Sequence, residues 1–564
     1  MLPLDAVLGA PHADAPREAY ADACEDSGDL ARARFIRLQL RQARLGRYSA
    51  QRFDVAHEIR LLEAQHRRRW LSELPHVPGV TYGRFRRGFV DSVFVREPVN
   101  LADALPRLVA AIPLARWVSA DGAPSTLALP SHAAIEECEI AGGRDGARAA
   151  ALGALLAGAG AQGLRKLAMS WPREDERERV LDKLVGWGCA LEELELLGRG
   201  PDHHEVVKLS EAAGLSGLQV LRLDTDPRSG GWDGPEGRSA VEAILDRTSR
   251  LRSISLPGAS GEAAQALFDH GPATLEQLGV GSLVGVRPES ASFTLKSIDC
   301  GTTNGLSAPC FSGLRRAQVM GTATSLELPP TLVELAVGAG PATCSAPPPE
   351  LEALTLVRCP GLLPLVRASS ATLRVLKLLE CGALPTPPSL PRLHALRLYR
   401  VSDWQRFPAS APALRSVSID AAGMSDDVLT ELGGRPLSDV HLRALPAPFP
   451  AAWALLSLTV TGEDVVLMDV LPASLPLLQD LSLCWTGDDS AAVAAWLERG
   501  APNLTDFYMS GVPASVELLE MMSTSKWSAR LHFGLVTSAP SSRSLTGVRA
   551  GELSETSPLD SDWS

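Results

Sequence analysis

A six-residue run with leucine at its first, fourth and sixth positions recurs through most of this chain. The clearest copy is Leu373-Arg-Val-Leu376-Lys-Leu378, and the same spelling returns on either side of it at Leu351 and Leu393. Side chains alternate between the two faces of a β-strand, so positions 4 and 6 point one way and positions 3 and 5 the other. Each copy therefore predicts a strand with one aliphatic face and one face that varies.

This six-residue pattern begins at seventeen points along the chain, and a further, degenerate strand is expected at 531–533. This periodicity is typical of a leucine-rich-repeat solenoid, in which neighbouring repeats share one continuous core. The predicted fold class is α/β, a curved parallel sheet with mixed helical and extended returns and a small N-terminal helical module. The copies begin at Ile135, Leu164, Leu191, Leu218, Leu251, Leu275, Leu295, Leu314, Leu332, Leu351, Leu373, Leu393, Leu414, Leu437, Leu455, Leu478 and Leu504.

The returns between copies are of two kinds. The early copies lie mostly 24 to 33 residues apart and contain helix-like segments at 178–185 and 240–245. From Leu275 to Leu478 the spacing falls to 18 to 23 residues, and prolines crowd the returns at 328–330, 347–349 and 385–388. Proline fixes φ and removes a donor, so we expect extended returns there. The early kind resembles ribonuclease-inhibitor repeats, the later kind resembles the short repeats of secreted bacterial effectors, and 491–498 restores a helix.

Composition bounds the class of protein. A net charge of −12 over 564 residues argues against nucleic-acid binding, which normally needs a basic footprint. No secretory signal or membrane-length apolar run is found, so the predicted compartment is the cytoplasm, without membrane binding. The nine cysteines form no C-x-x-C pair, which predicts neither a zinc site nor a disulfide framework. We expect no cofactor.

Before the repeats, three helices are predicted. Asp14 is placed to cap the first, which contains Tyr20 and ends before Gly28. A second carries apolar residues from 35 to 40. A third carries Val55, Ile59 and Leu62 on one face, with His66 interpreted as a packed residue on that same face.

Charge is segregated within these helices. Residues 5–29 hold seven acids and one arginine, whereas residues 31–69 hold eleven arginines and three acids. One interpretation is mutual neutralisation between packed helices. The other is a basic docking surface around residues 67–69, and binding of RNA through the arginines from 32 to 69 stays a third possibility.

Several short motifs resemble the bacterial repeat-companion domain. They are Asp14-Ala-Pro-Arg17, Tyr20-Ala-Asp22, Gly28-Asp29, Phe35-Ile-Arg-Leu-Gln39 and Arg86-Arg-Gly-Phe-Val90, with Ala23 and Cys24 standing where the family usually has Trp and Leu. The resemblance covers about the first 95 residues and implies a small helical module that precedes repeats, with no established activity. The predicted organisation is a module at 1–87, first strands and cap at 88–134, repeats at 135–534 and a disordered tail at 535–564.

Catalytic patterns are not found. The chain lacks a phosphate-binding glycine loop, His-Glu-x-x-His and a Gly-x-Ser-x-Gly elbow. Asp202-His203-His204-Glu205 has metal-binding residue types, but it is interpreted as a solvent-exposed loop between repeats. Cys359 and Cys381, at position 9 of their repeats, are interpreted as buried structural residues. We therefore expect no enzyme activity, no catalytic residue and no metal ligand.

A candidate partner site comes from the outward positions. Positions 2 and 5 of three consecutive copies carry five basic or potentially basic residues, and Glu352 and Asp439 bound the run on either side. Like charges on adjacent strands repel unless they are solvated or paired with an anion. The first hypothesis is a non-enzymatic scaffold that binds a protein with an acidic patch on the concave face; the alternatives are a solvated face, and an effector-like adaptor that delivers a substrate to a ligase. The five residues are Arg374, Lys377, His394, Arg397 and Arg415.

Overall fold

The computed structural model describes residues 4–536, with gaps. The predicted tail from 537 to 564 lies outside the described residues, as does much of the predicted cap region. Gaps of four residues or more fall at 96–107, 113–116, 122–134, 142–146, 225–231, 403–406, 421–425, 444–454, 463–470, 486–489 and 511–531, and shorter ones elsewhere.

By contacts between Cα atoms the chain divides into two compact units. Unit 1 comprises Met1–Leu40, Arg69–Leu332 and Ala342–Pro348. Unit 2 comprises Arg41–Arg68, Val333–Pro341 and Pro349–Ser564. Each unit thus combines part of the N-terminal helical segment with a set of strands, and each is described by itself.

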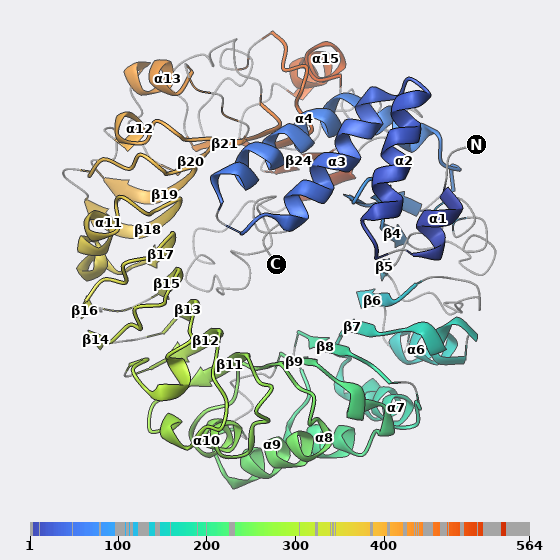
Figure 1. The fold of residues 1–564 in the computed structure, drawn as a ribbon, viewed down its shortest axis with the longest axis vertical. Helices are drawn as coiled ribbons and strands as arrows, with labels where there is room; N and C mark the ends of the chain where they lie inside the picture. The colour runs from blue at the N-terminus through green and yellow to red at the C-terminus, as the bar shows by residue number, and fades with distance from the viewer. Residues whose placement is uncertain are drawn as a thin grey trace. The chain divides into compact units, whose positions relative to one another are not determined.

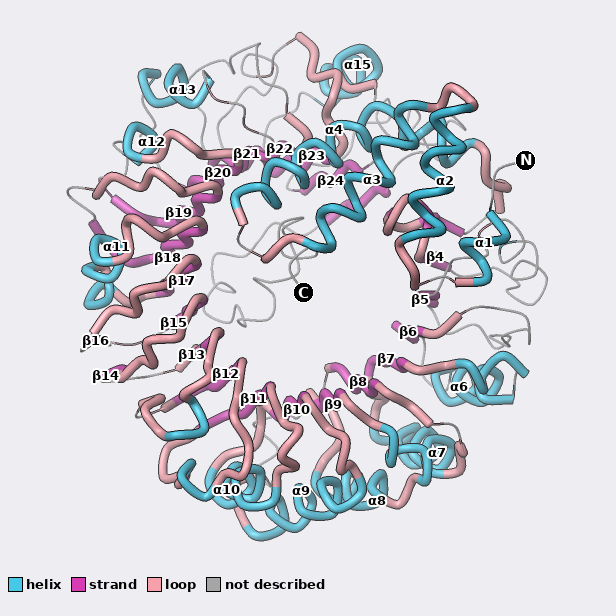
Figure 2. Tube along the Cα trace, in the orientation of Figure 1, coloured by secondary structure: helices cyan, strands magenta, loops and turns pink. Residues whose placement is uncertain are grey.

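In unit 1 the strands pair in parallel in chain order from β4 to β13, and β1 pairs antiparallel with β4. Helices α6 to α10 lie on one side of strands β6 to β11 (Figures 1 and 2). The strands are β1 (Val80–Tyr82), β4 (Ser92–Val95), β5 (Trp117–Asp121), β6 (Glu137–Ala141), β7 (Lys166–Ser170), β8 (Glu193–Leu197), β9 (Val220–Leu223), β10 (Ser253–Leu256), β11 (Gln277–Ser282), β12 (Ser297–Thr302) and β13 (Arg316–Val319).

The helical returns of unit 1 follow the prediction at 178–185 and 240–245. Each such helix buries one apolar side, as α9 does with Val241 and Ile244. Two further strands, β14 (Ser325–Leu326) and β16 (Thr343–Cys344), form a separate small sheet. The returns contain α6 (Ala147–Ala157), η1 (Ala159–Gly163), α7 (Glu174–Val185), α8 (His203–Ser210), η2 (Ala213–Gly217), α9 (Pro235–Arg247), α10 (Gly261–His270), η3 (Pro288–Ser290) and η4 (Pro309–Phe311).

In unit 2 the strands also pair in parallel in chain order, from β15 to β25. The degenerate strand expected at 531–533 is present as β25, which extends to Val536. The strands are β15 (Glu334–Gly338), β17 (Ala353–Val357), β18 (Val375–Ala383), β19 (Ala395–Ser402), β20 (Ser416–Asp420), β21 (Asp439–Arg443), β22 (Ser457–Gly462), β23 (Asp480–Trp485), β24 (Asp506–Ser510) and β25 (His532–Val536).

The leucine pattern predicts the register in which neighbouring strands pair. In every one of the seventeen copies the strand begins two residues after the copy's first residue. Leu376 lies opposite Leu354 and Leu396 on the neighbouring strands, and all three side chains are buried. Because the aliphatic positions of adjacent strands coincide, they form a continuous core on the side of the returns. We call the opposite side, which carries positions 3 and 5, the open face.

The proline-rich returns are only partly extended. Residues 328–330 and 347–349 are non-helical as predicted, whereas Pro385 lies outside the described residues. The expectation of extended returns is wrong at several other points, because proline is tolerated in the first turn of a helix and begins two of these short segments. Among the described residues, the returns of unit 2 contain η5 (Pro360–Leu362), α11 (Pro364–Ala368), α12 (Phe407–Ser410), α13 (Asp426–Gly433) and the predicted α15 (Ser490–Gly500).

The N-terminal segment contains the three predicted helices and one that was missed. They are α2 (Ala15–Asp26), α3 (Leu30–Arg44) and α4 (Ala50–Ser72), and the missed helix is α1 (Leu4–Gly9). Asp14 stands at the N-cap of α2, but the expected side-chain cap is wrong. Its own backbone is helical, and its carboxylate lies 3.4 Å from Arg87 Nη1 instead.

Two of the resemblance motifs meet in unit 1. Strands β2 (Phe85–Arg86) and β3 (Phe89–Val90) form a hairpin whose two turn residues, Arg87 and Gly88, both have positive φ. That is the type I′ geometry that favours glycine. The buried Gln39 side chain of α3 donates to the Phe85 carbonyl at 2.9 Å and accepts from the Gly88 N–H at 2.6 Å. A Cβ on Gly88 would lie 2.2 Å from Ile36, so hairpin and helix require this glycine.

Candidate functional site

The five predicted site residues lie together on the open face of unit 2, along strands β18 to β20. Lys377 and Arg397 occupy position 5 and are direct partners in the parallel register. Arg374, His394 and Arg415 each immediately precede a strand. Their backbones are linked in series, because His394 N–H donates to the Arg374 carbonyl and Arg415 N–H donates to the His394 carbonyl, each at 2.8 Å. We call these five residues the basic stripe.

Their environments differ. Arg374 Nε lies 3.2 Å from the Glu352 carboxylate, and its side chain is only 15% exposed. Arg415 lies 3.7 Å from Asp54 of helix α4. His394 is buried, with 6% of its surface exposed. The stripe is therefore partly neutralised and partly covered by other parts of the same chain.

Helix α4 provides that cover. The Phe53 ring stacks on the His394 ring with 4.6 Å between centroids and 14° between planes. Seven residues along the helix, Arg60 Nη1 lies 2.6 and 2.7 Å from the two carboxylate oxygens of Asp439, on strand β21. Both partners of this ion pair are largely buried, with 23% and 13% of their side chains exposed. All of these residues belong to unit 2. Helix α4 lies on one side of the strands, and helices α11, α12 and α13 lie on the other side (Figure 2).

The α4 residues in this contact were missed by sequence reasoning, although a signal was present. Positions 53, 57 and 60 follow helical spacing and share one side of the helix. Val55 and Ile59, which predicted the apolar face, lie on the opposite side and are also buried. A helix that carries aromatic and apolar residues on two sides is expected to pack against other elements on both. The second side of α4 holds Phe53, His57 and Arg60.

Both histidines of the contact are held neutral. Burial lowers the pKa of His394, with Arg374 and Arg415 adding to the effect against a hydrogen bond to the Arg392 carbonyl, at 2.6 Å from Nδ1. Burial also lowers the pKa of His57, helped by the charges of Arg60 and Arg415. A histidine with a pKa below its usual value of about 6.5 is uncharged at neutral pH. His394 therefore contributes an aromatic surface to the stripe rather than a positive charge.

The outer part of the stripe consists of two basic residues. Lys377 and Arg397 are half-buried on the open face, side by side on β18 and β19. Within the described part of the chain Arg397 has no acidic partner in salt-bridge range. Two like charges on paired strands favour an anionic counterpart.

The charge segregation of the N-terminal helices is explained in part by pairing. In unit 1, Arg37 contacts both Asp22 and Glu25, at 2.7 and 2.6 Å, and Arg69 contacts Asp29 at 2.7 Å. In unit 2, Arg47 lies 3.6 Å from Glu334 on β15. These contacts favour the interpretation of mutual neutralisation, and they extend it to acids supplied by the strands.

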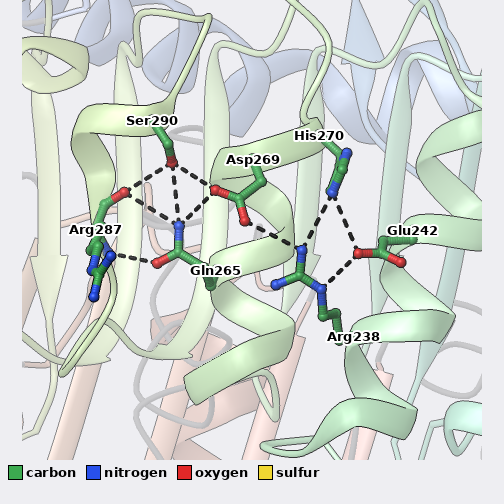
Figure 3. Close-up of polar contacts among 7 residues, drawn as sticks. All are labelled: Arg238, Glu242, Gln265, Asp269, His270, Arg287 and Ser290. Atoms are coloured by element: carbon green, nitrogen blue, oxygen red, sulfur yellow. Dashed lines mark hydrogen bonds and ion pairs between the residues drawn. The ribbon is translucent and has the colours of Figure 1, made fainter.

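A second polar cluster lies on the helix-covered side of unit 1, between α9, α10 and η3 (Figure 3). Ser290 donates to the Asp269 carboxylate at 2.8 Å, and His270 Nε2 lies 3.3 Å from Glu242. Burial raises the pKa of Asp269, but hydrogen bonds from Gln265 and Ser290 outweigh it and leave this pKa below its usual value. The histidine thus faces Glu242 rather than the serine, so the cluster links adjacent returns and does not pair a nucleophile with a base.

The residues considered for metal binding or nucleophilic chemistry have structural roles. The interpretation of Asp202 to Glu205 as a loop is wrong, because they begin helix α8. Asp202 accepts from the Glu205 N–H and the Glu205 carboxylate accepts from the Asp202 N–H, each at 2.9 Å, which is a capping box. Cys359 and Cys381 are buried as predicted, their thiols lie near backbone carbonyls, and burial raises both pKa values.

Comparisons with protein-family models and with curated proteins returned no match to this chain. Among the described residues no group of three or more histidine, cysteine, aspartate or glutamate side chains is placed to hold a metal ion. No helix in the described ranges combines the length and apolarity that crossing a membrane requires.

Proposed function

We propose that this chain is a non-enzymatic interaction scaffold, a helical repeat-companion module followed by a leucine-rich-repeat solenoid. The parallel sheets support the architecture, because each strand pairs with the next in the sequence and one face is left to outward side chains. The motifs that meet at the Gln39 contact with the β2–β3 hairpin support the assignment of the module. The described cysteines all carry free thiols, which supports a reducing, cytoplasmic setting.

The single observation that carries the binding role is the alignment of charge on the open face. The register places Lys377 and Arg397 directly opposite each other, with Arg374 and Arg415 flanking them. Repulsion between paired like charges is relieved by an anionic partner. We propose a protein with an acidic patch as that partner, rather than nucleic acid, because the whole chain carries a net charge of −12.

Affinity capture on the full-length chain tests this proposal. Wild type, Arg397→Glu and a control, Arg222→Glu, are used as baits in native lysate and the captured proteins quantified by mass spectrometry. Arg222 serves as the control because it lies on the open face of β9, outside the stripe, with 52% of its side chain exposed; it pairs with Glu195 at 3.3 Å, so a thermal melt must first show that Arg222→Glu stays folded. The proposal predicts reproducible partners that Arg397→Glu loses and Arg222→Glu keeps. No reproducible partner, or equal capture by all three baits, would count against it.

A further inference from the structure

Helix α4 contacts residues at the starts of three successive strands of unit 2, through two adjacent residues and a third about two helical turns further on. Phe53 reaches His394 before β19, Asp54 reaches Arg415 before β20, and Arg60 reaches Asp439 on β21. Seven residues of helix rise about 10.5 Å. Two spacings between neighbouring strands cover about 9.6 Å. The two turns of α4 from Phe53 to Arg60 therefore span about the same distance as the two strand spacings from β19 to β21.

The charges in this contact are complementary in order along the helix. Asp54 of α4 lies near Arg415 of the open face, and Arg60 of α4 pairs with Asp439 of the same face. The Arg60–Asp439 pair is the better formed of the two, with contacts of 2.6 and 2.7 Å. A helix with its charges reversed would place like charges together, so the order of charges selects which helices fit.

We infer that the open face of β19 to β21 is a helix-binding surface, that α4 is its resident ligand, and that the partner enters as a helix which displaces α4. This inference rests on the proposed function and names the class of partner. The matching helix carries an aromatic residue, an acid directly after it and an arginine seven residues on, as α4 does with Phe53, Asp54 and Arg60.

Displacement follows from which stripe residues α4 engages. His394 is buried against Phe53, and Arg415 is in contact with Asp54. A partner that binds the whole stripe must therefore replace the α4 contacts of both His394 and Arg415. Lys377 and Arg397 lie beside this contact on β18 and β19, so they are placed to meet the partner first.

A peptide in trans tests the surface without needing the natural partner. A fluorescent peptide of residues 46–68 is titrated into the full-length chain, wild type or with Phe53→Ala and Arg60→Ala together to release α4. If α4 occupies the face nine-tenths of the time or more, the released variant should bind the peptide about tenfold more tightly, because only the open fraction binds. Equal affinity for both proteins would overturn the inference.

A charge exchange tests the recognition itself. In the released variant, Asp439→Arg should weaken peptide binding at least about tenfold, since it places like charges at the closest contact. A peptide carrying Arg60→Asp should restore binding to that protein. Loss without restoration, or no loss, would contradict the assigned contact. If the released variant does not fold, hydrogen exchange of the wild-type chain decides the question: excess peptide should speed exchange of backbone amides in 50–68, and unchanged exchange would refute displacement.

The peptide experiments and the capture experiment can fail separately. Capture of no partner would remove the proposed function while the peptide still reports whether the face binds helices. Conversely, a captured partner sensitive to Arg397→Glu, together with a peptide that ignores α4 release, would keep the scaffold and remove the helix-binding surface.

Discussion

Leu376→Ala and Lys377→Ala are neighbouring substitutions that test the strand register through their unequal effects. Leu376 is fully buried between Leu354 and Leu396 on adjacent strands. Truncation to alanine removes three carbons, about 2.4 kcal/mol of transfer free energy at about 0.8 kcal/mol each. The cavity left in a tightly paired core raises the expected loss of unfolding free energy to about 3–4 kcal/mol. Lys377 points to the open face, so its truncation should cost less than about 0.5 kcal/mol.

Urea unfolding followed by far-UV circular dichroism measures both variants against wild type. The expected result is a clear drop in the transition midpoint for Leu376→Ala and little change for Lys377→Ala. Equal destabilisation, or a larger loss from the lysine, would mean that the two faces of β18 have been assigned the wrong way round.

Three further predictions concern other parts of the fold. Gly301→Ala should destabilise by about 1–3 kcal/mol in urea unfolding, since its Cβ would lie 2.3 Å from the carbonyl oxygen of Gly281, whereas Gly305→Ala, whose Cβ would lie 3.9 Å from Glu327, should be near neutral. Glu380 has φ of 54°, so Glu380→Gly should be about 1 kcal/mol more stable than Glu380→Ala; both lose the carboxylate, and an equal or more stable alanine variant would contradict backbone strain. Because the folded pKa values of His57 and His394 are lowered, stability is full above the unfolded value of about 6.5 and falls as pH drops below it. Thermal melting at pH 7.5 and 5 should show that fall, and replacing both histidines with glutamine should flatten it.

The strands could be predicted from sequence because their signal is local and repeated. Each copy places its aliphatic residues at the same offsets, so one run such as Leu373–Leu378 fixes both the strand and the face it buries. The helical returns were also predictable where an apolar period is long enough, as at Val180 and Leu184 in α7. The conformation of the proline-rich returns was harder to predict, because proline is compatible with both an extended segment and the first turn of a helix.

The contact of α4 with the open face could not be predicted in the same way. It joins Arg60 to Asp439 across 379 positions of sequence, and no local pattern specifies such a pairing. The stripe was predicted from charges on the strands alone, which omits the groups that another element supplies. Asp54 and Phe53 change what the stripe is: Arg415 acquires an acid, and His394 becomes a buried aromatic surface.

The Asp202 motif shows the same limit on a smaller scale. Its residue types suggest a metal site or an exposed loop when considered one by one. Considered as an N-cap followed three residues later by glutamate, Asp202 and Glu205 are the two ends of a capping box. The capping-box pattern is therefore present in the sequence, but it has this meaning only at the start of a helix, here α8.

The most direct test of the binding face is the association rate of a captured partner as a function of salt. Charge contacts mainly raise association rates, and they are screened over about 8–10 Å at physiological ionic strength. Arg397→Glu should slow association and flatten its salt dependence while the thermal melt stays unchanged, and Arg222→Glu should leave the association rate near that of wild type. Equal slowing by both reversals would show an effect of bulk charge, and no change from Arg397→Glu would show that the stripe is a solvated face.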